Sequence, residues 1–318
     1  MLVYDFEKPI VELEKNIDEL RRYSEEVKID ASAELEGLIK KRDELCREIY
    51  SNLKPYELVQ IARHPQRPYT LDYISRCFSD FQELHGDRRF YDDGTMVGGF
   101  ATIEGRKVMV IGQQKGRTAK ENIQRNFGMA HPEGYRKALR LMQLADRFSL
   151  PIVTLIDTAG AYPGIGAEER GQAEAIAVNL RDMMELGVPV VSAVIGEGGS
   201  GGAIGIGVCN RLLVLSNSYY SVISPEGCAA ILFHDAKRAE DAAAALRLSA
   251  KDLLNLGIAD EIIEEPLGGA HRDHEGAAIS LKEALIRNLD ELSKLSPEEL
   301  KEQRFQKFRS IGSLKELS

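Results

Sequence analysis

Apolar runs alternate with glycine-rich loops and amphipathic segments through the middle of the chain. The pattern predicts strands over residues 95–103, 107–112, 151–157 and 188–195, with helices over 132–149 and 167–186. The strand at 188–195 is almost continuously apolar, which is typical of a strand buried on both faces. Repeated strand, loop and helix predict an α/β core. Its glycine-rich loops should meet at the carboxyl ends of the strands, where ligands bind in such folds.

Helical segments flank this core at both ends. Apolar residues at helical spacing after Pro9 and after Ser32 predict an N-terminal helical hairpin. Residues 54–70 are expected to be a proline-punctuated connector, and Thr70 to cap a helix that runs to about Leu84. The chain after Cys209 predicts further short strands and helices, and it closes with two charged helices. The expected division is 1–60 for the hairpin, 61–265 for the core and 266–318 for the C-terminal helices.

Composition narrows the class of protein. The chain has 318 residues, 43% of them hydrophobic, and can bury a substantial core. Its net charge of −9 argues against a general nucleic-acid binder, because phosphate contact needs an excess of clustered Lys and Arg. No apolar run approaches the roughly 20 residues of a membrane span. The acidic N-terminal segment does not resemble a signal peptide, so a cytoplasmic location is expected.

No metal site is predicted in this chain. The four cysteines are widely spaced, and no CxxC pair is present to start a zinc site. The six histidines include no HExxH motif, and His271 and His274 fall in a polar loop. The cysteines are expected to be free, buried thiols.

The most unusual stretch is Val188–Val208, VPVVSAVIGEGGSGGAIGIGV, where five glycines fall within seven positions. A strand, a glycine turn and a helix are predicted here. Gly198 to Gly202 satisfy G-x-S-x-G, so one hypothesis makes Ser200 a hydrolase nucleophile. A second makes the backbone amides an oxyanion hole, since unpaired N–H groups at a helix start suit an anion. A third is a tight turn without chemistry.

Several long motifs resemble a known family. They are HPQRPYTLDYI from His64, VGGF from Val97, GQQKGR from Gly112, RNFGMAHPEGYRKALRLM from Arg125, IDTAGAYPGIGAEERGQ from Ile156, VIGEGGSGGA from Val194, YSVISPEGCA from Tyr220 and EPLGGAHR from Glu265. Together they closely resemble the α subunits of bacterial acetyl-CoA carboxylase carboxyltransferases, over nearly the whole chain. One departure is Ala159, where the family more often has proline.

The resemblance implies a crotonase-like (ClpP/crotonase) fold, a superhelix of ββα units. It also implies a heterotetramer of two α and two β subunits, with a zinc ribbon on β. The implied reaction moves a carboxyl group from carboxybiotin, on a biotin carboxyl carrier protein that a biotin carboxylase serves, to acetyl-CoA. The product would be malonyl-CoA for fatty acid synthesis. In this chemistry negative charge develops on the ureido oxygen of biotin and on the thioester oxygen, so backbone donors are needed rather than a nucleophile.

The resemblance suggests that α holds the biotin side of a composite site. The amides of Gly201 and Gly202 are then the expected oxyanion hole, with Gly198 and Gly199 shaping the approach, and Ser200 is a small spacer. Biotin or substrate contacts are expected from Tyr162, Gly164, Arg136 and Lys137. Lys115, Arg117 and Arg125 are further candidates for the migrating carboxylate or the CoA phosphates. Asp157 is expected to bond loop amides, and Glu226 to be a helix N-terminal acid. A serine hydrolase and a non-catalytic assembly scaffold are the alternatives.

Overall fold

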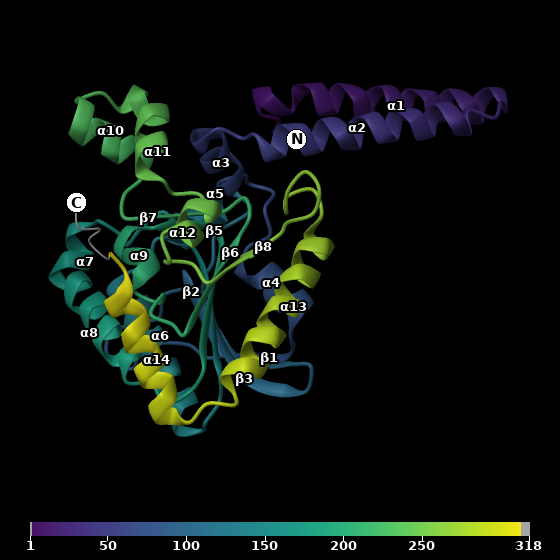
Figure 1. The fold of residues 1–318 in the computed structure, drawn as a ribbon. Coiled ribbons are helices and arrows are strands. Elements are labelled where there is room, and N and C mark those ends of the chain that lie inside the picture. The colour runs from purple at the N-terminus through teal and green to yellow at the C-terminus, as the bar shows by residue number, and fades with distance from the viewer. Residues whose placement is uncertain (1, 313–318) are drawn as a thin grey trace, which may run out of the picture.

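The computed structural model describes residues 2–312, and its centre is an eight-stranded mixed sheet (Figure 1). The strands run in the spatial order β1-β2-β3-β4-β5-β6-β8, and β7 lies off this path and pairs with the C-terminal part of β5. Their bounds are β1 Ser79–Glu83, β2 Met96–Ile103, β3 Arg106–Gln113, β4 Ile152–Thr158, β5 Val190–Gly199, β6 Arg211–Leu215, β7 Tyr219–Ser221 and β8 Glu261–Ile263. All the strands predicted in the core are present.

The strand pairing changes from antiparallel to parallel at β3. Strands β1, β2 and β3 pair antiparallel, and β2 and β3 form the predicted hairpin through Glu104 and Gly105. Both turn residues have positive φ, 44° and 76°, as a two-residue hairpin turn requires. From β3 onward the pairs are parallel, so the strands from β3 to β6 end at one edge of the sheet. The glycine-rich loops therefore lie at a shared edge.

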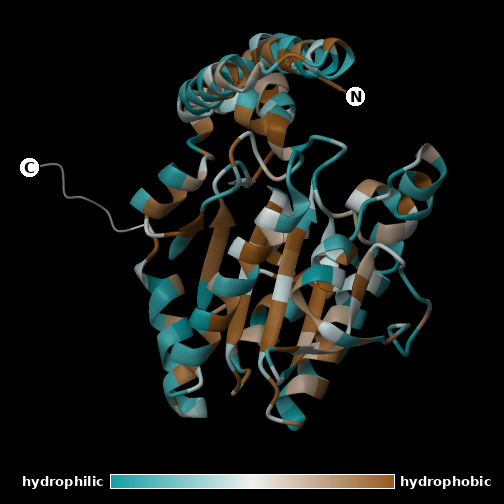
Figure 2. Ribbon diagram, turned by 90° about the vertical axis from the view of Figure 1, so that its right-hand side faces the viewer, coloured by the Kyte–Doolittle hydropathy of each residue, from teal (hydrophilic) through white to brown (hydrophobic). Residues whose placement is uncertain are grey.

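Both faces of the sheet are buried, because alternate residues of each central strand enter different cores. In β5, Val191, Ala193 and Ile195 join one apolar cluster, whereas Val190 and Val194 join the other. Figure 2 shows the strands as a nearly continuous hydrophobic layer within more polar helices. Burial on both faces explains why the strand sequence is continuously apolar rather than alternating.

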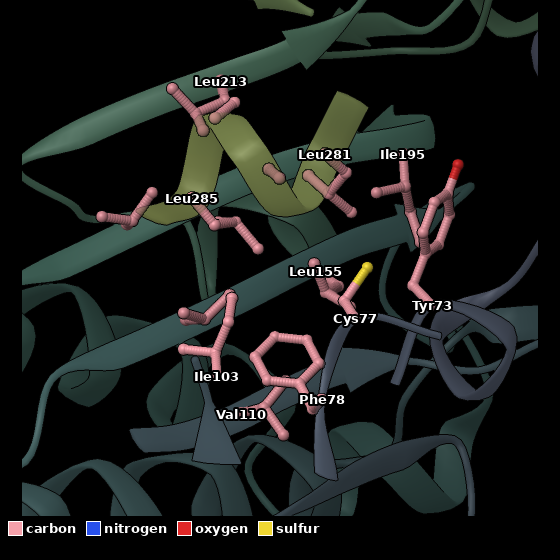
Figure 3. Close-up of a cluster of buried hydrophobic side chains, with 14 of the residues drawn as sticks. Tyr73, Cys77, Phe78, Ile103, Val110, Leu155, Ile195, Leu213, Leu281 and Leu285 are labelled. Carbon is pink, nitrogen blue, oxygen red and sulfur yellow. The ribbon is translucent and has the colours of Figure 1, made fainter. Parts of the chain in front are cut away.

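Helices cover the two faces. Helix α6 (Pro132–Arg147) and α8 (Gln172–Met184) pack on one face, and α4 (Thr70–Cys77) with α13 (His274–Leu292) on the other. Leu281 and Leu285 of α13 face the strands that carry Leu155 and Val110 (Figure 3). Helix α14 (Pro297–Ser310) follows α13. The C-terminal helices thus contribute to the core, and the proposed segment boundaries remain a prediction.

Two helical pairs project from this body (Figure 1). The predicted N-terminal hairpin is present as α1 (Lys8–Val27) and α2 (Ser32–Ser51). It is fixed by the buried Glu7, which accepts hydrogen bonds from Tyr50 Oη at 2.9 Å and from His271 Nε2 at 3.4 Å. The second projection holds α10 (Pro225–Phe233) and α11 (Ala239–Leu246), and α12 (Ala250–Asn255) leads back to the sheet.

Three local predictions are wrong. The expected connector contains a helix, α3 (Pro55–Ala62), which begins at proline and whose Glu57 side chain accepts from the Lys54 N–H. The helix from Thr70 ends at Cys77 rather than Leu84, because the next residues pair with β2 as strand β1. The helix expected over 167–186 is broken into α7 (Ile165–Glu169) and α8 by Gly171, which has a φ of 83°.

All four cysteines are free and buried, as expected. Within residues 2–312, no helix combines the length and apolar character needed to cross a membrane.

Candidate active site

The glycine-rich stretch is divided between a strand and a short helix. Strand β5 continues through Gly199, so the prediction that it ends at Ile195 is wrong. The cause is β7, which pairs with Gly198 and Gly199 and extends the sheet. Helix α9 (Ser200–Ile204) follows directly and has only five residues. Because so few peptide dipoles are aligned, individual N–H groups rather than a strong macrodipole are available at this turn.

The loop after β4 packs against the turn, backbone to backbone. A Cβ atom on Gly199 would lie 2.2 Å from the carbonyl oxygen of Ala159, and one on Gly202 would lie 2.4 Å from the carbonyl carbon of Gly160. Neither backbone group can move aside as a flexible side chain would. These two glycines are therefore required by close approach, and the two glycine-rich loops form one unit.

Gly201 lies on the open side of the same turn. A Cβ atom there would meet only Ile176 Cδ1, at an ordinary contact distance of 3.5 Å. Gly201 and Ser200 border a cavity of about 430 Å³, with mainly apolar walls. The other lining residues are Ile204, Tyr220, Ser221, Val222, Leu246, Arg247, Leu253, Leu256 and Ile258. The turn thus presents bare backbone to an apolar cavity of small-molecule size.

Ser200 has the backbone of a strained turn residue but lacks the partners of a nucleophile. Its φ is 52°, and it is exposed at the first position of α9. A serine nucleophile needs a histidine within hydrogen-bond reach and an acid to orient that histidine. The cavity beside Ser200 is lined by no histidine and no carboxylate. The serine hydrolase hypothesis is therefore wrong.

A buried ionic network lies beside the turn, at the ends of β3, β4 and β5. Lys115 Nζ contacts Asp157 Oδ1 at 2.7 Å and Glu197 Oε2 at 2.8 Å. Arg63 Nε contacts Glu197 Oε1 at 2.7 Å, and its Nη1 contacts Glu226 Oε1 at 2.6 Å. Asp157 Oδ1 also accepts from the Glu197 N–H at 3.0 Å, so this carboxylate bonds an amide of β5 rather than the loop amides that were expected.

In this network, neighbouring opposite charges shift the pKa values of Glu197 and Lys115 more than burial does. Burial alone would raise the pKa of Glu197, but Lys115 and Arg63 lower it to about 2. Burial would lower the pKa of Lys115, whereas Asp157 and Glu197 raise it above its ordinary value. Each of these groups is thus held in its charged form. Glu226, in the first turn of α10, is the helix N-terminal acid that was predicted.

Tyr162 and Gly164 lie together in the loop that follows β4. The Tyr162 ring packs on His131 with a centroid separation of 4.2 Å, and its backbone oxygen accepts from Gln172 Nε2 at 3.0 Å. A Cβ atom on Gly164 would lie 2.4 Å from Tyr162 Cε1, so this glycine leaves room for the ring. Neither residue lines the apolar cavity. Their role in binding biotin or substrate remains a prediction.

Arg136 and Lys137 face acidic side chains of their own chain. Arg136 Nε contacts Asp87 Oδ2 at 2.9 Å, and its Nη2 contacts Glu133 Oε1 at 3.0 Å. Lys137 is fully buried, and its Nζ lies 2.8 Å from Asp92 Oδ1. Neither cation lines the apolar cavity. The structure therefore brings neither of them to the glycine turn, and their predicted contacts with substrate remain predictions.

The two other predicted cations are also engaged locally. Arg117 pairs with Asp72, and its guanidinium lies 4.0 Å from the centroid of the Tyr69 ring. Arg125 donates to the carbonyl oxygen of Gly94. Within residues 2–312, no group of three or more His, Cys, Asp or Glu side chains is arranged to hold a metal ion.

Two parts of the site were not predicted from the sequence. The far wall of the cavity comes from α11, α12 and the segment after them, through Leu246, Leu253 and Ile258. No local pattern connects these residues to a turn some fifty positions earlier. The second missed residue is Gln113, a fully buried amide whose Nε2 donates to the carbonyl oxygen of Gly202 at 3.0 Å. A glutamine at the end of an apolar strand was a signal that could have identified it.

Known proteins resemble this chain over nearly its full length. A family described as acetyl co-enzyme A carboxylase carboxyltransferase-like matches residues 3–312. The acetyl-coenzyme A carboxylase carboxyl transferase subunit alpha of Halorhodospira halophila is 57% identical over 308 residues, 97% of each chain. The protein of the same name from Thermus thermophilus is 56% identical over 312 residues, 98% of this chain and 99% of its own.

Solved structures share the fold at low sequence identity. A transcarboxylase 12S structure has a TM-score of 0.60 and 19% identity, covering 75% of this chain and 44% of its own. The beta subunit of Pseudomonas aeruginosa geranyl-CoA carboxylase has a TM-score of 0.56 and 19% identity, covering 78% and 46%. The expected crotonase-like fold is confirmed. On the family match and these relatives, the chain belongs to the acetyl co-enzyme A carboxylase carboxyltransferase-like family of enzymes.

Proposed function

We propose that this chain is the α subunit of an acetyl-CoA carboxylase carboxyltransferase. With a β subunit it transfers the carboxyl group of carboxybiotin to acetyl-CoA and forms malonyl-CoA. The observation that carries this proposal is 56–57% identity to carboxyl transferase α subunits over almost the whole length of both chains. The further assignments are an α2β2 heterotetramer, a zinc ribbon on β, a biotin carrier protein charged by a biotin carboxylase, and a cytoplasmic location.

The apolar cavity is the proposed site for biotin. Biotin is a compact, largely apolar bicycle, and a cavity of about 430 Å³ with aliphatic walls suits such a group. One end of the cavity is bordered by Gly201, where no side chain covers the backbone. The residues present therefore fit the group. When bound as carboxybiotin, it supplies the carboxyl group that is transferred.

The proposed catalytic groups of this chain are the N–H groups of Gly201 and Gly202. Within residues 2–312, no side chain caps the start of α9, and no loop carbonyl accepts from either N–H. Gly201 borders the cavity and Gly202 is the next residue of the turn. Two preorganised donors at this turn would stabilise negative charge that develops on an oxygen bound there. Loss of one such donor typically raises a barrier by about 2.7–4 kcal/mol. Gly198 and Gly199 are buried against Tyr220 and the Ala159 backbone, and they would shape the turn by allowing this close packing.

Separate and combined assays of the two subunits test this proposal. The purified chain should form no malonyl-CoA from acetyl-CoA and a carboxylated biotin carrier. The same chain mixed with a carboxyltransferase β subunit should form it, and the reverse reaction should consume malonyl-CoA in the presence of free biotin. Full activity of the chain alone would contradict the composite site. No activity with β, while the two subunits co-purify, would contradict the proposed reaction.

A further inference from the structure

The short helix that follows the glycine turn is held by side chains from three other elements. A helix leaves its last carbonyl groups without internal partners, and five residues are too few to be stable alone. In α9 and the two residues that follow it, three carbonyls accept from buried side chains. Gly205 O accepts from Asn179 Nδ2 at 2.8 Å, and Ile206 O accepts from Thr154 Oγ1 at 2.9 Å. The third side-chain donor binds a carbonyl within α9, that of Gly202.

That donor is Gln113, at the end of β3. Its Nε2 donates to Gly202 O at 3.0 Å, and its Oε1 accepts from the Asp157 N–H at 3.1 Å. Its own backbone oxygen accepts from Thr70 Oγ1 at 2.6 Å. The side chain is fully buried, so water cannot replace either contact without a cavity. One amide thus ties the glycine turn to β4 and, through its backbone, to the start of α4.

We infer that Gln113 is a positioning residue for carboxyl transfer. It holds the Gly202 carbonyl, one peptide after the Gly202 N–H, and so fixes Gly202 where the amides of Gly201 and Gly202 meet the developing oxyanion. The inference rests on the proposed function, because it assigns Gln113 a role toward the amides of Gly201 and Gly202. Gln113 does not line the cavity. Its effect is exerted through Gly202, whose other side is held by the backbone of Gly160.

A positioning role has a defined kinetic signature. An oxyanion donor acts when charge develops, so its displacement lowers kcat more than it alters substrate binding. A misplacement of about 1 Å at a catalytic group costs up to ~100-fold in rate. Loss of Gln113 should therefore lower kcat and leave KM for acetyl-CoA and for biotin near the wild-type values.

The first experiment compares Gln113→Leu with Asn288→Leu in the complex with β. Asn288 is also a buried amide that donates to a backbone carbonyl, that of Ala284, but it lies on α13. We expect Gln113→Leu to lower kcat about 10- to 100-fold, and Asn288→Leu to lower only the melting temperature. Near-wild-type kcat for Gln113→Leu in a folded complex would overturn the inference.

Gln113→Glu provides a second test, which does not depend on whether Gln113→Leu folds. The introduced carboxylate keeps an acceptor for the Asp157 N–H but loses the donor to Gly202. When protonated it regains one donor, and burial favours this neutral form. Activity relative to wild type should therefore rise as the pH falls from about 8 to about 6. A constant ratio would overturn the donor role.

The nearby charged groups are the same in both proteins. Lys115, Asp157 and Glu197 lie at this end of β3 in both proteins, and the ratio of variant to wild type compares the two in that shared setting. Failure of the proposed function can be distinguished from failure of the inference about Gln113. If the proposed function is wrong, the wild-type chain with β forms no malonyl-CoA. Failure of the inference leaves wild-type activity intact and affects only the comparison among the variants.

Discussion

Gly202 packs directly against the backbone of Gly160, so that a single added methyl group would lie 2.4 Å from the Gly160 carbonyl carbon. The same methyl group would lie 2.6 Å from the Gly160 oxygen and 2.8 Å from the Ala161 nitrogen. The two glycine-rich loops therefore fix one another. Gly201, one residue earlier, has no such constraint, and this difference provides a matched pair of variants.

Gly202→Ala should remove most of the carboxyltransferase activity, whereas Gly201→Ala should retain most of it. Alanine at 202 must displace the turn or the opposing loop, and loss of one oxyanion donor costs about 10²–10³-fold in kcat. Alanine at 201 meets Ile176 at an ordinary distance of 3.5 Å and keeps its N–H. Steady-state kinetics of both variants with β would check this. Equal activities would contradict the assigned packing constraint.

Ser200→Gly and Ser200→Ala should both retain carboxyl transfer. The φ of Ser200 is 52°, a conformation that glycine adopts without strain. Ser200→Gly should therefore leave the melting temperature unchanged or raise it, while Ser200→Ala keeps the strain and removes only the hydroxyl group. A loss of activity common to both variants would show that the hydroxyl group takes part in the reaction.

Val222→Trp should raise the KM for free biotin without lowering kcat. Val222 lines the cavity and is 82% exposed, so a larger ring there narrows the opening without disturbing the core. We expect KM for free biotin to rise about tenfold, equivalent to ~1.4 kcal/mol, with kcat little changed. Val222→Ala is the control. An unchanged KM in the tryptophan variant would place biotin outside this cavity.

Most of the fold could be predicted because its signals are local. Continuous apolar runs marked β4 and β5, and the Glu104–Gly105 turn marked the hairpin between β2 and β3. The sequence predicts a helix where β1 lies, because the largely exposed residues of β1 carry a weak pattern and only pairing with β2 makes the segment a strand. The extension of β5 through Gly199 has the same origin, since it depends on β7.

The site could be predicted only in its contiguous part. The glycine turn is visible as a motif, and its amides follow from the chemistry of oxyanions. The cavity walls at Leu246 and Ile258, and the contact from Gln113 to Gly202, join residues distant in the chain. Arg136 and Lys137 are predicted to contact substrate because they are cations within a family-like motif, and sequence does not reveal that Asp87 and Asp92 contact them.

Lys115→Met should strongly destabilise the fold. The Lys115 ammonium group contacts two buried carboxylates, Asp157 and Glu197. Its removal leaves their negative charges with fewer positive partners. Removing one partner of a buried ion pair typically lowers the free energy of unfolding by about 3–5 kcal/mol. Urea unfolding should show a loss of this size relative to Lys120→Met, which changes an exposed lysine close by. Equal midpoints for the two variants would contradict a structural role of the network.

The same network should make stability fall in acid over a defined range. The pKa of Glu197 is about 2 in the folded chain, against an ordinary value of 4.5, because Lys115 and Arg63 outweigh the effect of burial. A lowered folded pKa means that the unfolded chain takes up the proton first. The contribution of Glu197 is therefore complete above about pH 4.5 and is lost as the pH falls toward 2.

Glu197→Gln should consequently have a lower urea midpoint than wild type at neutral pH and a shallower loss of stability between about pH 4.5 and 2. The neutral amide cannot take up this proton, so its share of the pH dependence disappears. Glu19→Gln, which changes an exposed residue of α1, is the control and should follow the wild-type curve. Parallel curves for wild type and Glu197→Gln would show that Glu197 is not the group whose protonation weakens the fold.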